Sequence, residues 1–335
     1  MNYIGSKYKL AEFIADSIKE VVGSFEGTTI AELFGGTGII ARNLKSEVKK
    51  LIVNDLEPYS FTLLKNYIGN TQPIAQSEAL IQTLNDLPPF EGFIYQHYCA
   101  GGGSGRMYFS DENGQKIDAI RQQIEAWKKT QHIDEPTYYF LLASLLESAD
   151  KVANTASVYG AFLKHLKKSA LKELELTPAE FAITQQANEV YNEDANELVK
   201  RPAVQGDILY LDPPYNARQY GANYHLLNTI ALYDDFEPKG KTGLRDYNRS
   251  VYCQKDKVAT AFEALIADAQ FQYIFVSYNN EGLMSKEEVK RILSKYGKYS
   301  LKTTQYQRFK ADKTENRNHK ADATEEYLHI LVKNF

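Results

Sequence analysis

The residues best suited to chemistry form a tetrad, Asp212-Pro213-Pro214-Tyr215, directly after an apolar stretch at residues 207–211. That stretch predicts a buried strand. Two consecutive prolines end it, because neither has an N–H to offer to a strand ladder. Ligands of open α/β sheets bind beyond the carboxyl ends of strands. We therefore expect a carboxylate and an aromatic ring to face a ligand there.

The tetrad contains the groups needed to handle an aromatic amine. The exocyclic amine of a nucleobase is a poor nucleophile, since its lone pair is delocalised into the ring. The Asp212 carboxylate and the Pro213 carbonyl can accept its two hydrogens and orient the nitrogen, while Tyr215 stacks on the base. Stacking contributes about 1–3 kcal/mol per base, comparable to the few kcal/mol that extruding a base costs. A rigid turn without a ligand is the alternative.

A glycine-rich turn, Phe34-Gly35-Gly36-Thr37-Gly38, lies between a predicted strand and a predicted helix. Glycines there let the backbone pass close to a ligand. The turn also fits the loose dinucleotide fingerprint, so it leaves open a dinucleotide, another adenosine-containing cofactor, or no ligand. Asp55, at the end of the next strand, is placed to bind a ribose or to cap a helix.

Strands and helices alternate at both ends of the chain, which predicts an α/β fold with roughly seven strands in a mostly parallel sheet and a terminal hairpin. Residues 71–184 lack this alternation and predict an inserted, mainly helical domain, with the catalytic domain formed by 1–70 and 185–335. The expected strands are 28–34, 51–55, 189–192, 207–211, 273–278, 300–309 and 326–333; the expected helices are 9–22, 39–44, 117–127, 137–150, 162–174, 223–232, 257–268 and 286–296.

The composition indicates a soluble cytoplasmic protein. Of the 335 residues 43% are hydrophobic, yet no stretch approaches the ~20 apolar residues of a membrane span, and no secretory signal is evident. Cys99 and Cys253 lie far apart and lack metal-ligand spacing, so we expect a reducing compartment and no metal.

The net charge of −4 and a pI of about 6.0 do not by themselves indicate a nucleic-acid-binding protein. Residues 286–321, however, contain eleven lysines and arginines and only four aspartates and glutamates. This segment is either a surface that follows phosphates or a solvated helix and loop.

Together these segments resemble the amino-methyltransferases. The glycine turn, Asn54-Asp55 and the tetrad look like motifs I, II and IV, and residues 3–7 resemble motif X. Their order, with motif X first and the insertion ahead of motif IV, is similar to the alpha group of adenine-specific DNA methyltransferases, which includes the Dam methylases. Residues 148–164 and 212–245 look closer to the FokI-type modification methylases, whose FokI member is thought of as two fused halves. This chain is long enough for one.

The resemblance implies the Rossmann-like fold of S-adenosylmethionine-dependent methyltransferases, with that cofactor and without a metal. Lys7 would bind the cofactor carboxylate, Asp55 the ribose and Asp194 the adenine, although Asp194 could instead start a helix. The residues that the resemblance assigns to the cofactor are Tyr3, Lys7, Glu32, Phe34, Gly35, Gly36, Gly38, Asp55 and Asp194.

The activity implied is methyl transfer to N(6) of a flipped adenine at a short specific site in duplex DNA, within a restriction–modification system. Asp212, Pro213, Pro214 and Tyr215 would be catalytic, residues 71–184 would recognise the target, and a cognate restriction endonuclease is a candidate partner. Alternatives are methylation of a cytosine amine, of RNA adenine or of protein glutamine, a dehydrogenase, and a DNA-binding module without catalysis. A dehydrogenase would explain the glycine turn and not the tetrad.

Two further segments are open to a functional or a structural interpretation. The residues directly after the tetrad could close over an extruded base or pack in the core; they are Arg218, Tyr220, Asn223, Tyr224 and His225. A general base at His225 is not required, because the methylated amine can release its proton to solvent. The glycine-rich loop at 101–105, followed by Arg106, is either an element that orders on DNA or an idle surface loop.

Overall fold

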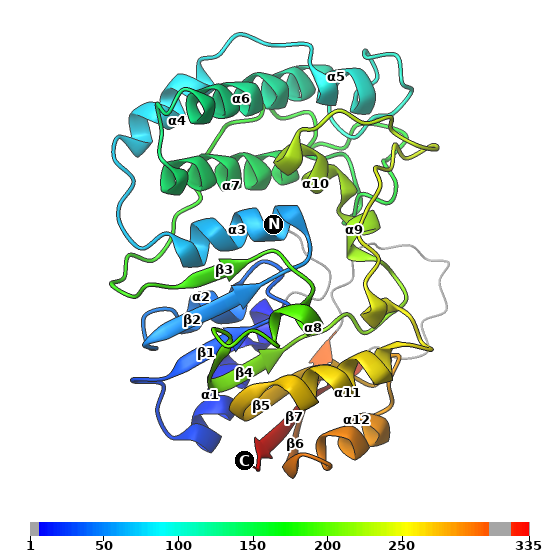
Figure 1. Cartoon of the computed structure of the whole chain (residues 1–335). Coiled ribbons are helices and arrows are strands. Elements are labelled where there is room, and N and C mark those ends of the chain that lie inside the picture. The colour runs from blue at the N-terminus through cyan, green and yellow to red at the C-terminus, as the bar shows by residue number, and fades with distance from the viewer. Residues whose placement is uncertain (1–6, 308–322, 335) are drawn as a thin grey trace. The chain divides into compact units, whose positions relative to one another are not determined.

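The described residues, 7–307 and 323–334, form two units in the computed structural model (Figure 1). Unit 1 comprises Glu57–Gln185 and Tyr220–Tyr247. Unit 2 comprises Lys7–Leu56, Gln186–Gln219 and the described residues from Asn248 onward. The assignment of residues 71–184 to a separate recognition domain stays a prediction.

Unit 2 is built on one sheet of seven strands in the order β3-β2-β1-β4-β5-β7-β6. The first five strands of this order are parallel, and β7 is antiparallel to both of its neighbours, β5 and β6. The sheet therefore confirms the α/β prediction, including the terminal hairpin. The strands are β1 (Thr29–Glu32), β2 (Lys50–Asn54), β3 (Glu189–Tyr191), β4 (Gln205–Leu211), β5 (Gln270–Asn279), β6 (Gly297–Gln307) and β7 (Ala323–Lys333).

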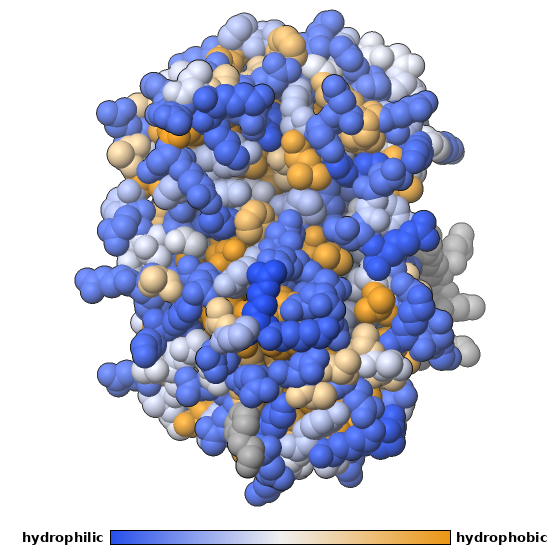
Figure 2. Space-filling view, in the orientation of Figure 1, coloured by the Kyte–Doolittle hydropathy of each residue, from blue (hydrophilic) through white to orange (hydrophobic). Residues whose placement is uncertain are grey.

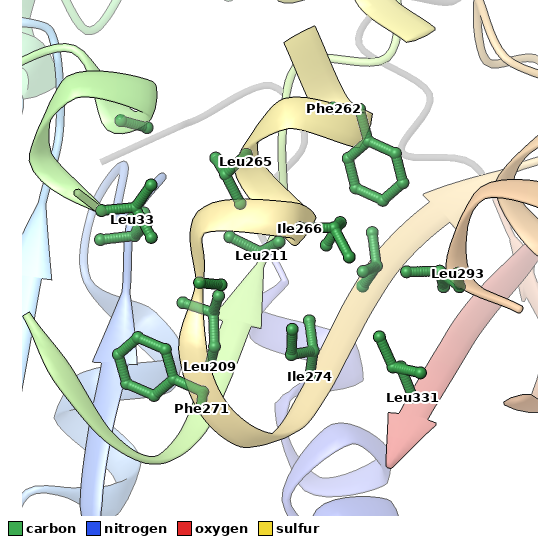
Figure 3. Packing of buried hydrophobic residues seen from close by; sticks show 14 of the residues in the cluster. Leu33, Leu209, Leu211, Phe262, Leu265, Ile266, Phe271, Ile274, Leu293 and Leu331 are labelled. Atoms are coloured by element: carbon green, nitrogen blue, oxygen red, sulfur yellow. The ribbon is translucent and has the colours of Figure 1, made fainter. Parts of the chain in front are cut away.

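One face of this sheet is covered by α8 (Ala195–Leu198), α11 (Val258–Asp268) and α12 (Lys286–Leu293). Figure 3 shows Leu265 and Ile266 of α11 beside Leu211 of β4, in a cluster that also contains Phe262, Leu209 and Ile274. Since strands covered on both faces are apolar along their whole length, the buried runs that end β4 and β5 account for the sequence pattern.

The opposite face carries the remaining alternate residues of the same strands, among them Glu32, Tyr210 and Ser277. Glu32 bonds to helix α2 (Ile39–Leu44), and α2 packs against α1 (Ala11–Val22). Because side chains alternate along a strand, polar groups near the carboxyl ends of β1, β4 and β5 share this second face.

Unit 1 is mainly helical, with two long helices, α6 and α7, at its centre. Ser110 caps the start of α6 and Asp134 the start of α7, each by accepting a backbone N–H from three residues onward. The visible surface over α4 and α6 is largely hydrophilic with scattered hydrophobic residues (Figure 2). Its helices are α3 (Pro58–Leu64), α4 (Ser77–Asn85), α5 (Phe93–Tyr98), α6 (Asp111–Lys129), α7 (Glu135–Val152), α9 (Tyr220–Asn223) and α10 (His225–Leu232), with a π-helical turn at Lys65–Gly69.

The helix predicted at residues 162–174 is wrong: this segment contains bends and turns. Its apolar residues have helical spacing, but Asn154 engages its backbone instead. The backbone N–H of Leu163 donates to the Asn154 carbonyl at 3.0 Å, and that of Lys167 donates to the Asn154 side chain at 3.0 Å. Tertiary hydrogen bonds of this kind override local helix propensity.

Asn154 is fully buried and uses both ends of its amide. Its Nδ2 donates to the carbonyls of Met107 at 2.9 Å and Leu163 at 3.1 Å. Asn113, also buried, holds the next part of the segment by donating to Lys172 and accepting from Leu174. Residues 153–174 therefore follow a fixed path without regular secondary structure.

The glycine-rich loop at 101–105 is tied to its surroundings. The N–H of Gly101 donates to Asp111, and Ser104 donates to the His97 carbonyl. Arg106 donates to the carbonyls of residues 97, 238, 240 and 241. Its guanidinium thus connects two loops of unit 1, and the prediction that the loop orders on DNA remains untested. No helix in the described part of the chain is long and apolar enough to cross a membrane.

We expect Asn154→Ala to lower the free energy of unfolding by about 2–4 kcal/mol, because buried backbone groups lose their partners. Chemical denaturation measures the change. Lys168→Ala, which alters an exposed side chain of the same segment, is the control and should change stability by less than about 0.5 kcal/mol. Equal stabilities of the two variants would contradict the role given to Asn154.

Candidate active site

The carboxyl ends of β1, β2 and β3 are joined by one buried amide, that of Asn54. Its Nδ2 donates to the carbonyls of Leu33 at 3.1 Å and Glu193 at 3.0 Å, and its Oδ1 accepts from the Glu193 N–H at 3.0 Å. The Asn54 carbonyl also accepts from the N–H of Gly35 at 2.8 Å. Asn54 therefore fixes where the glycine turn leaves the sheet.

The glycine turn depends on left-handed backbone at two positions, Gly36 with φ 53° and Gly38 with φ 72°. Glycine adopts such angles without steric cost. The N–H of Gly36 donates to the Asp55 carboxylate at 2.7 Å. Helix α3 begins at Pro58, with Glu57 at its N-cap. The alternative interpretation of Asp55 as a helix cap is therefore wrong, because Asp55 turns toward the glycine turn.

Glu32, at the end of β1, is buried and accepts the N–H of Ala41 in the first turn of α2 at 3.0 Å. Burial raises the pKa of its carboxyl well above the ordinary value, and the nearby Asp212 and Asp55 raise it further, while the bond from Ala41 opposes the shift. Phe34 follows, with its ring edge-on to Tyr252 at 4.8 Å between centroids.

Strand β4 ends at the tetrad, where Asp212 meets two charged partners from distant parts of the chain. The Nζ of Lys7 lies 3.2 Å from Oδ1 of Asp212 and 3.5 Å from Oε2 of Glu326. We call these three residues the lysine–carboxylate cluster. The Lys7 side chain is 4% exposed, so its charge depends on the two carboxylates.

The cluster changes the pKa values of its members. Burial opposes the charge on Lys7, but Asp212 and Glu326 more than offset it, so the pKa of Lys7 is raised. Burial raises the pKa of Asp212 to about 6; Glu326 adds to the increase and Lys7 opposes it. Asp212 is therefore largely ionised at neutral pH, and Lys7 is protonated.

Oδ1 of Asp212 is buried without a well-directed hydrogen bond from any described residue. The Lys7 ammonium lies within hydrogen-bond distance of this oxygen and lowers the pKa of Asp212, but the angles of the contact fall short of a well-formed hydrogen bond. A buried carboxylate oxygen in this state is costly and accepts a donor readily. The site thus contains an acceptor that can receive an N–H from a ligand.

Tyr215 is held half-buried beside this acceptor. Its ring lies edge-on to Tyr278 at 6.4 Å, Lys7 Nζ lies 5.4 Å from its ring centroid, and its carbonyl accepts from the N–H of Leu283. Tyr278 is confined in turn, because a methyl group at Gly282 would lie 2.0 Å from its ring. The aromatic surface has a fixed position.

The remaining predicted site residues have other surroundings. Asp194 is exposed and caps α8 by accepting from the N–H groups of Asn196 and Glu197. These contacts are the ones expected of a residue that starts a helix. Tyr3 lies outside the described residues, as do positions 308–321 of the basic segment. His225 belongs to unit 1 and is fully buried, with Nε2 2.9 Å from the Tyr159 carbonyl.

Burial lowers the pKa of His225 to about 4, which agrees with its not being needed as a general base. Tyr224 is likewise fully buried in unit 1 and stacks on Tyr220. Of the two interpretations given for these residues, closing over a base or packing in the core, both side chains fit packing in the core.

Sequence reasoning missed Glu326, which the sequence treats only as the start of a strand. A signal was available: Glu326 shares a face of β7 with the buried residues Leu328 and Ile330. A carboxylate on an otherwise apolar face needs a charged partner. Which residue is that partner depends on the order of the strands, so the sequence around Glu326 could not identify it.

Comparison with known proteins gives one consistent result. Residues 3–292 match the model of the D12 class N6 adenine-specific DNA methyltransferase family. The chain is 65% identical over 336 residues to the type II methyltransferase M.NlaIII of Neisseria lactamica, with 100% of both chains covered. It is 40% identical to M.CviAII of Paramecium bursaria Chlorella virus 1, with 93% of each covered.

The chain is also 41% identical to M.FokI of Planomicrobium okeanokoites, but there the match covers 93% of this chain and 50% of that protein. This agrees with the expectation that the chain corresponds to one half of the FokI methylase. Within the described residues, no group of three or more His, Cys, Asp or Glu side chains is arranged to hold a metal ion.

We expect the Asp212 carboxyl to titrate at about pH 6, as measured by carboxyl-carbon NMR of aspartate-labelled protein. Lys7→Met should raise the midpoint, because the lysine opposes the increase. Lys9→Met, at an exposed neighbouring position, should leave it unchanged. A wild-type midpoint near the ordinary value of about 4 would contradict the described burial.

Proposed function

The chain belongs to the D12 class of N6 adenine-specific DNA methyltransferases, and on that premise we propose that Asp212, Pro213, Pro214 and Tyr215 bind the adenine that is methylated. The observation that carries the proposal is the buried Oδ1 of Asp212, which lacks a directed hydrogen bond among the described residues. The fold is that of the Rossmann-like methyltransferases, with the tetrad at the carboxyl end of β4.

We propose S-adenosylmethionine as the cofactor, which when bound supplies an electrophilic methyl group on a sulfonium. The residues described around the tetrad suit such a cation, since two carboxylates there accompany one ammonium. Gly36 and Gly38 would form the turn beneath it, Asp55 would bind the ribose, and Phe34 and Tyr252 offer an aromatic surface.

Two of the proposed cofactor-binding residues already have partners within the protein. Lys7 is bound by Asp212 and Glu326, so its expected contact with the cofactor carboxylate would be an additional one. One carboxylate oxygen of Asp194 is engaged by backbone N–H groups, and an adenine contact would use the other. Tyr3, Glu32 and Gly35 complete the proposed set.

The adenine amine would donate one hydrogen to Oδ1 of Asp212 and the other to the Pro213 carbonyl. This arrangement would direct the nitrogen lone pair toward the methyl donor. After transfer the nitrogen carries a surplus proton, which Asp212 can accept because its pKa of about 6 leaves it ionised at neutral pH. From there the proton passes to solvent. Tyr215 would stack on the base, a contact worth about 1–3 kcal/mol.

We propose that residues 71–184 contact the target DNA through the irregular segment after α7. Lys164, His165 and Lys168 are exposed on it, while buried amides hold its backbone. Phosphate contacts from such lysines would position the protein on the duplex. The basic segment at 286–321 is a second candidate surface.

We further propose that the protein is the modification part of a restriction–modification system, with a cognate restriction endonuclease acting on the same DNA site. Its substrate would then be DNA inside a bacterial cell, where a cytoplasmic enzyme would meet it. Methylation of a cytosine amine or of RNA has no specific support in the described site.

We expect expression in a methylation-free bacterial host to modify adenine throughout one short DNA motif, as mapped by single-molecule sequencing. Asp212→Ala should lower the transfer rate on the order of 10²–10³-fold or more, by analogy with loss of one preorganised catalytic hydrogen bond. Binding of S-adenosylmethionine, measured by calorimetry, should survive.

Asp256→Ala, at an exposed position of unit 2, is the matched control and should methylate like the wild type. Retained methylation by Asp212→Ala would refute the assignment of the tetrad. Modified cytosine in place of adenine would refute the proposed substrate.

We expect the double variant Lys164→Ala/Lys168→Ala to bind DNA more weakly and to reduce the slope of log affinity against log salt by about 2, since each phosphate contact contributes about 0.9. Fluorescence anisotropy at several salt concentrations measures this. Lys19→Ala/Lys49→Ala changes two exposed lysines of unit 2 that lie outside both candidate surfaces and is the control. An identical slope in the two double variants would exclude the segment from phosphate contact.

A further inference from the structure

We propose that Glu326 is a positioning residue for methyl transfer: it shares the Lys7 ammonium and thereby keeps Oδ1 of Asp212 available to the adenine amine. The proposal rests on the role proposed above for Asp212. Glu326 touches neither substrate nor cofactor in this scheme, and it acts through Lys7.

The distances describe a shared ammonium. Lys7 Nζ lies 3.2 Å from the Asp212 oxygen and 3.5 Å from the Glu326 oxygen. A lysine ammonium with a single carboxylate partner turns its N–H bonds toward that partner, since charge-assisted hydrogen bonds are the stronger kind. Here Oδ1 of Asp212 lacks such a bond from the described residues. We infer that the attraction of the second carboxylate, 3.5 Å away, contributes to this geometry.

The sheet holds Glu326 in this position. In the antiparallel pairing of β5 and β7, Glu326 lies opposite Asn279, the last residue of β5. The Asn279 amide is 3.5 Å from Oε1 of Glu326, and the glutamate is 8% exposed. One carboxylate oxygen thus faces Asn279 while the other faces Lys7, so the side chain has little freedom to follow the lysine.

Without Glu326 the ammonium has one carboxylate left. We expect it to close on Asp212 and to donate a directed hydrogen bond to Oδ1, the atom that the adenine amine needs. A filled acceptor orients the amine poorly, and misplacement of a reacting group by about 1 Å can cost on the order of 100-fold in rate.

Several titratable groups surround Asp212, and they differ in whether their charge acts on its pKa. Among the described residues, Lys7 and Glu326 act directly on the pKa of Asp212. Tyr210 on β4 and Glu32 on β1 also lie close enough to interact with it, and Tyr215 interacts with Lys7. The charges that raise the pKa of Glu32 are those of Asp212 and Asp55. Glu326 also raises the pKa values of Lys7 and Tyr210, but both already lie above neutral pH, so the change near pH 6 is measured at Asp212.

The test compares Glu326→Gln with Glu325→Gln. Glutamine keeps the shape of the side chain and its contact with Asn279 but removes the charge. Glu325 is the adjacent strand residue, and its carboxylate bonds to the Tyr327 hydroxyl at 2.8 Å, so it controls for charge removal. Three quantities are measured: the NMR titration midpoint of Asp212 in the protein alone, and kcat and KM for DNA at saturating S-adenosylmethionine.

We expect Glu326→Gln to lower the titration midpoint of Asp212, because a charge that raises it is gone, and to lower kcat at least about tenfold with little change in KM. Glu325→Gln should leave all three quantities unchanged. An unchanged kcat, or a lowered kcat with an unchanged Asp212 midpoint, would overturn the proposal. The second result is the one expected from a merely structural role.

A double-mutant cycle tests the route through Lys7. In a Lys7→Met background, Glu326→Gln should cause no further loss of kcat. An equal loss with and without the lysine would overturn the proposal. Failure of the proposed function is recognised separately, because Asp212→Ala would then remain active whatever Glu326 does.

Discussion

The arrangement of the candidate site depends on one constraint, the burial of the Lys7 ammonium. Removing such an ion from water costs several kcal/mol, and only close carboxylates offset that cost. Asp212 and Glu326 provide them from β4 and β7, at 3.2 Å and 3.5 Å. The segment before α1, the end of β4 and β7 therefore meet at one point in unit 2.

The same constraint leaves the site less stable than it could be. Three charged groups of the cluster share two ion-pair contacts, and the buried Oδ1 of Asp212 receives no directed bond from the described residues. Leaving such a group unsatisfied costs about 1–3 kcal/mol. A ligand amine that donates to this oxygen recovers part of that free energy on binding, which favours a donor at this position.

The sequence was informative wherever the signal was local. Apolar runs and the alternation of strand-like with helical segments predicted all seven strands, and the glycines and prolines predicted the two turns that follow β1 and β4. Contacts between distant parts of the chain could not be predicted. Glu326 lies close to Lys7 because β7 pairs with β5, and the sequence around either residue does not indicate that strand order. The predicted helix at 162–174 failed for the same reason, because Asn154 competes for its backbone from outside the segment.

In residues 153–174, the groups that fix the path of the backbone are different from the side chains that face solvent. Buried amides such as Asn154 and Asn113 determine where the backbone runs, while the exposed side chains between them contribute little to holding it. Exposed positions can then be exchanged during evolution without a change in fold or loss of catalytic residues. The side chains that this segment presents to solvent, such as Lys164 and Lys168, are therefore independent of the side chains that keep its backbone in place.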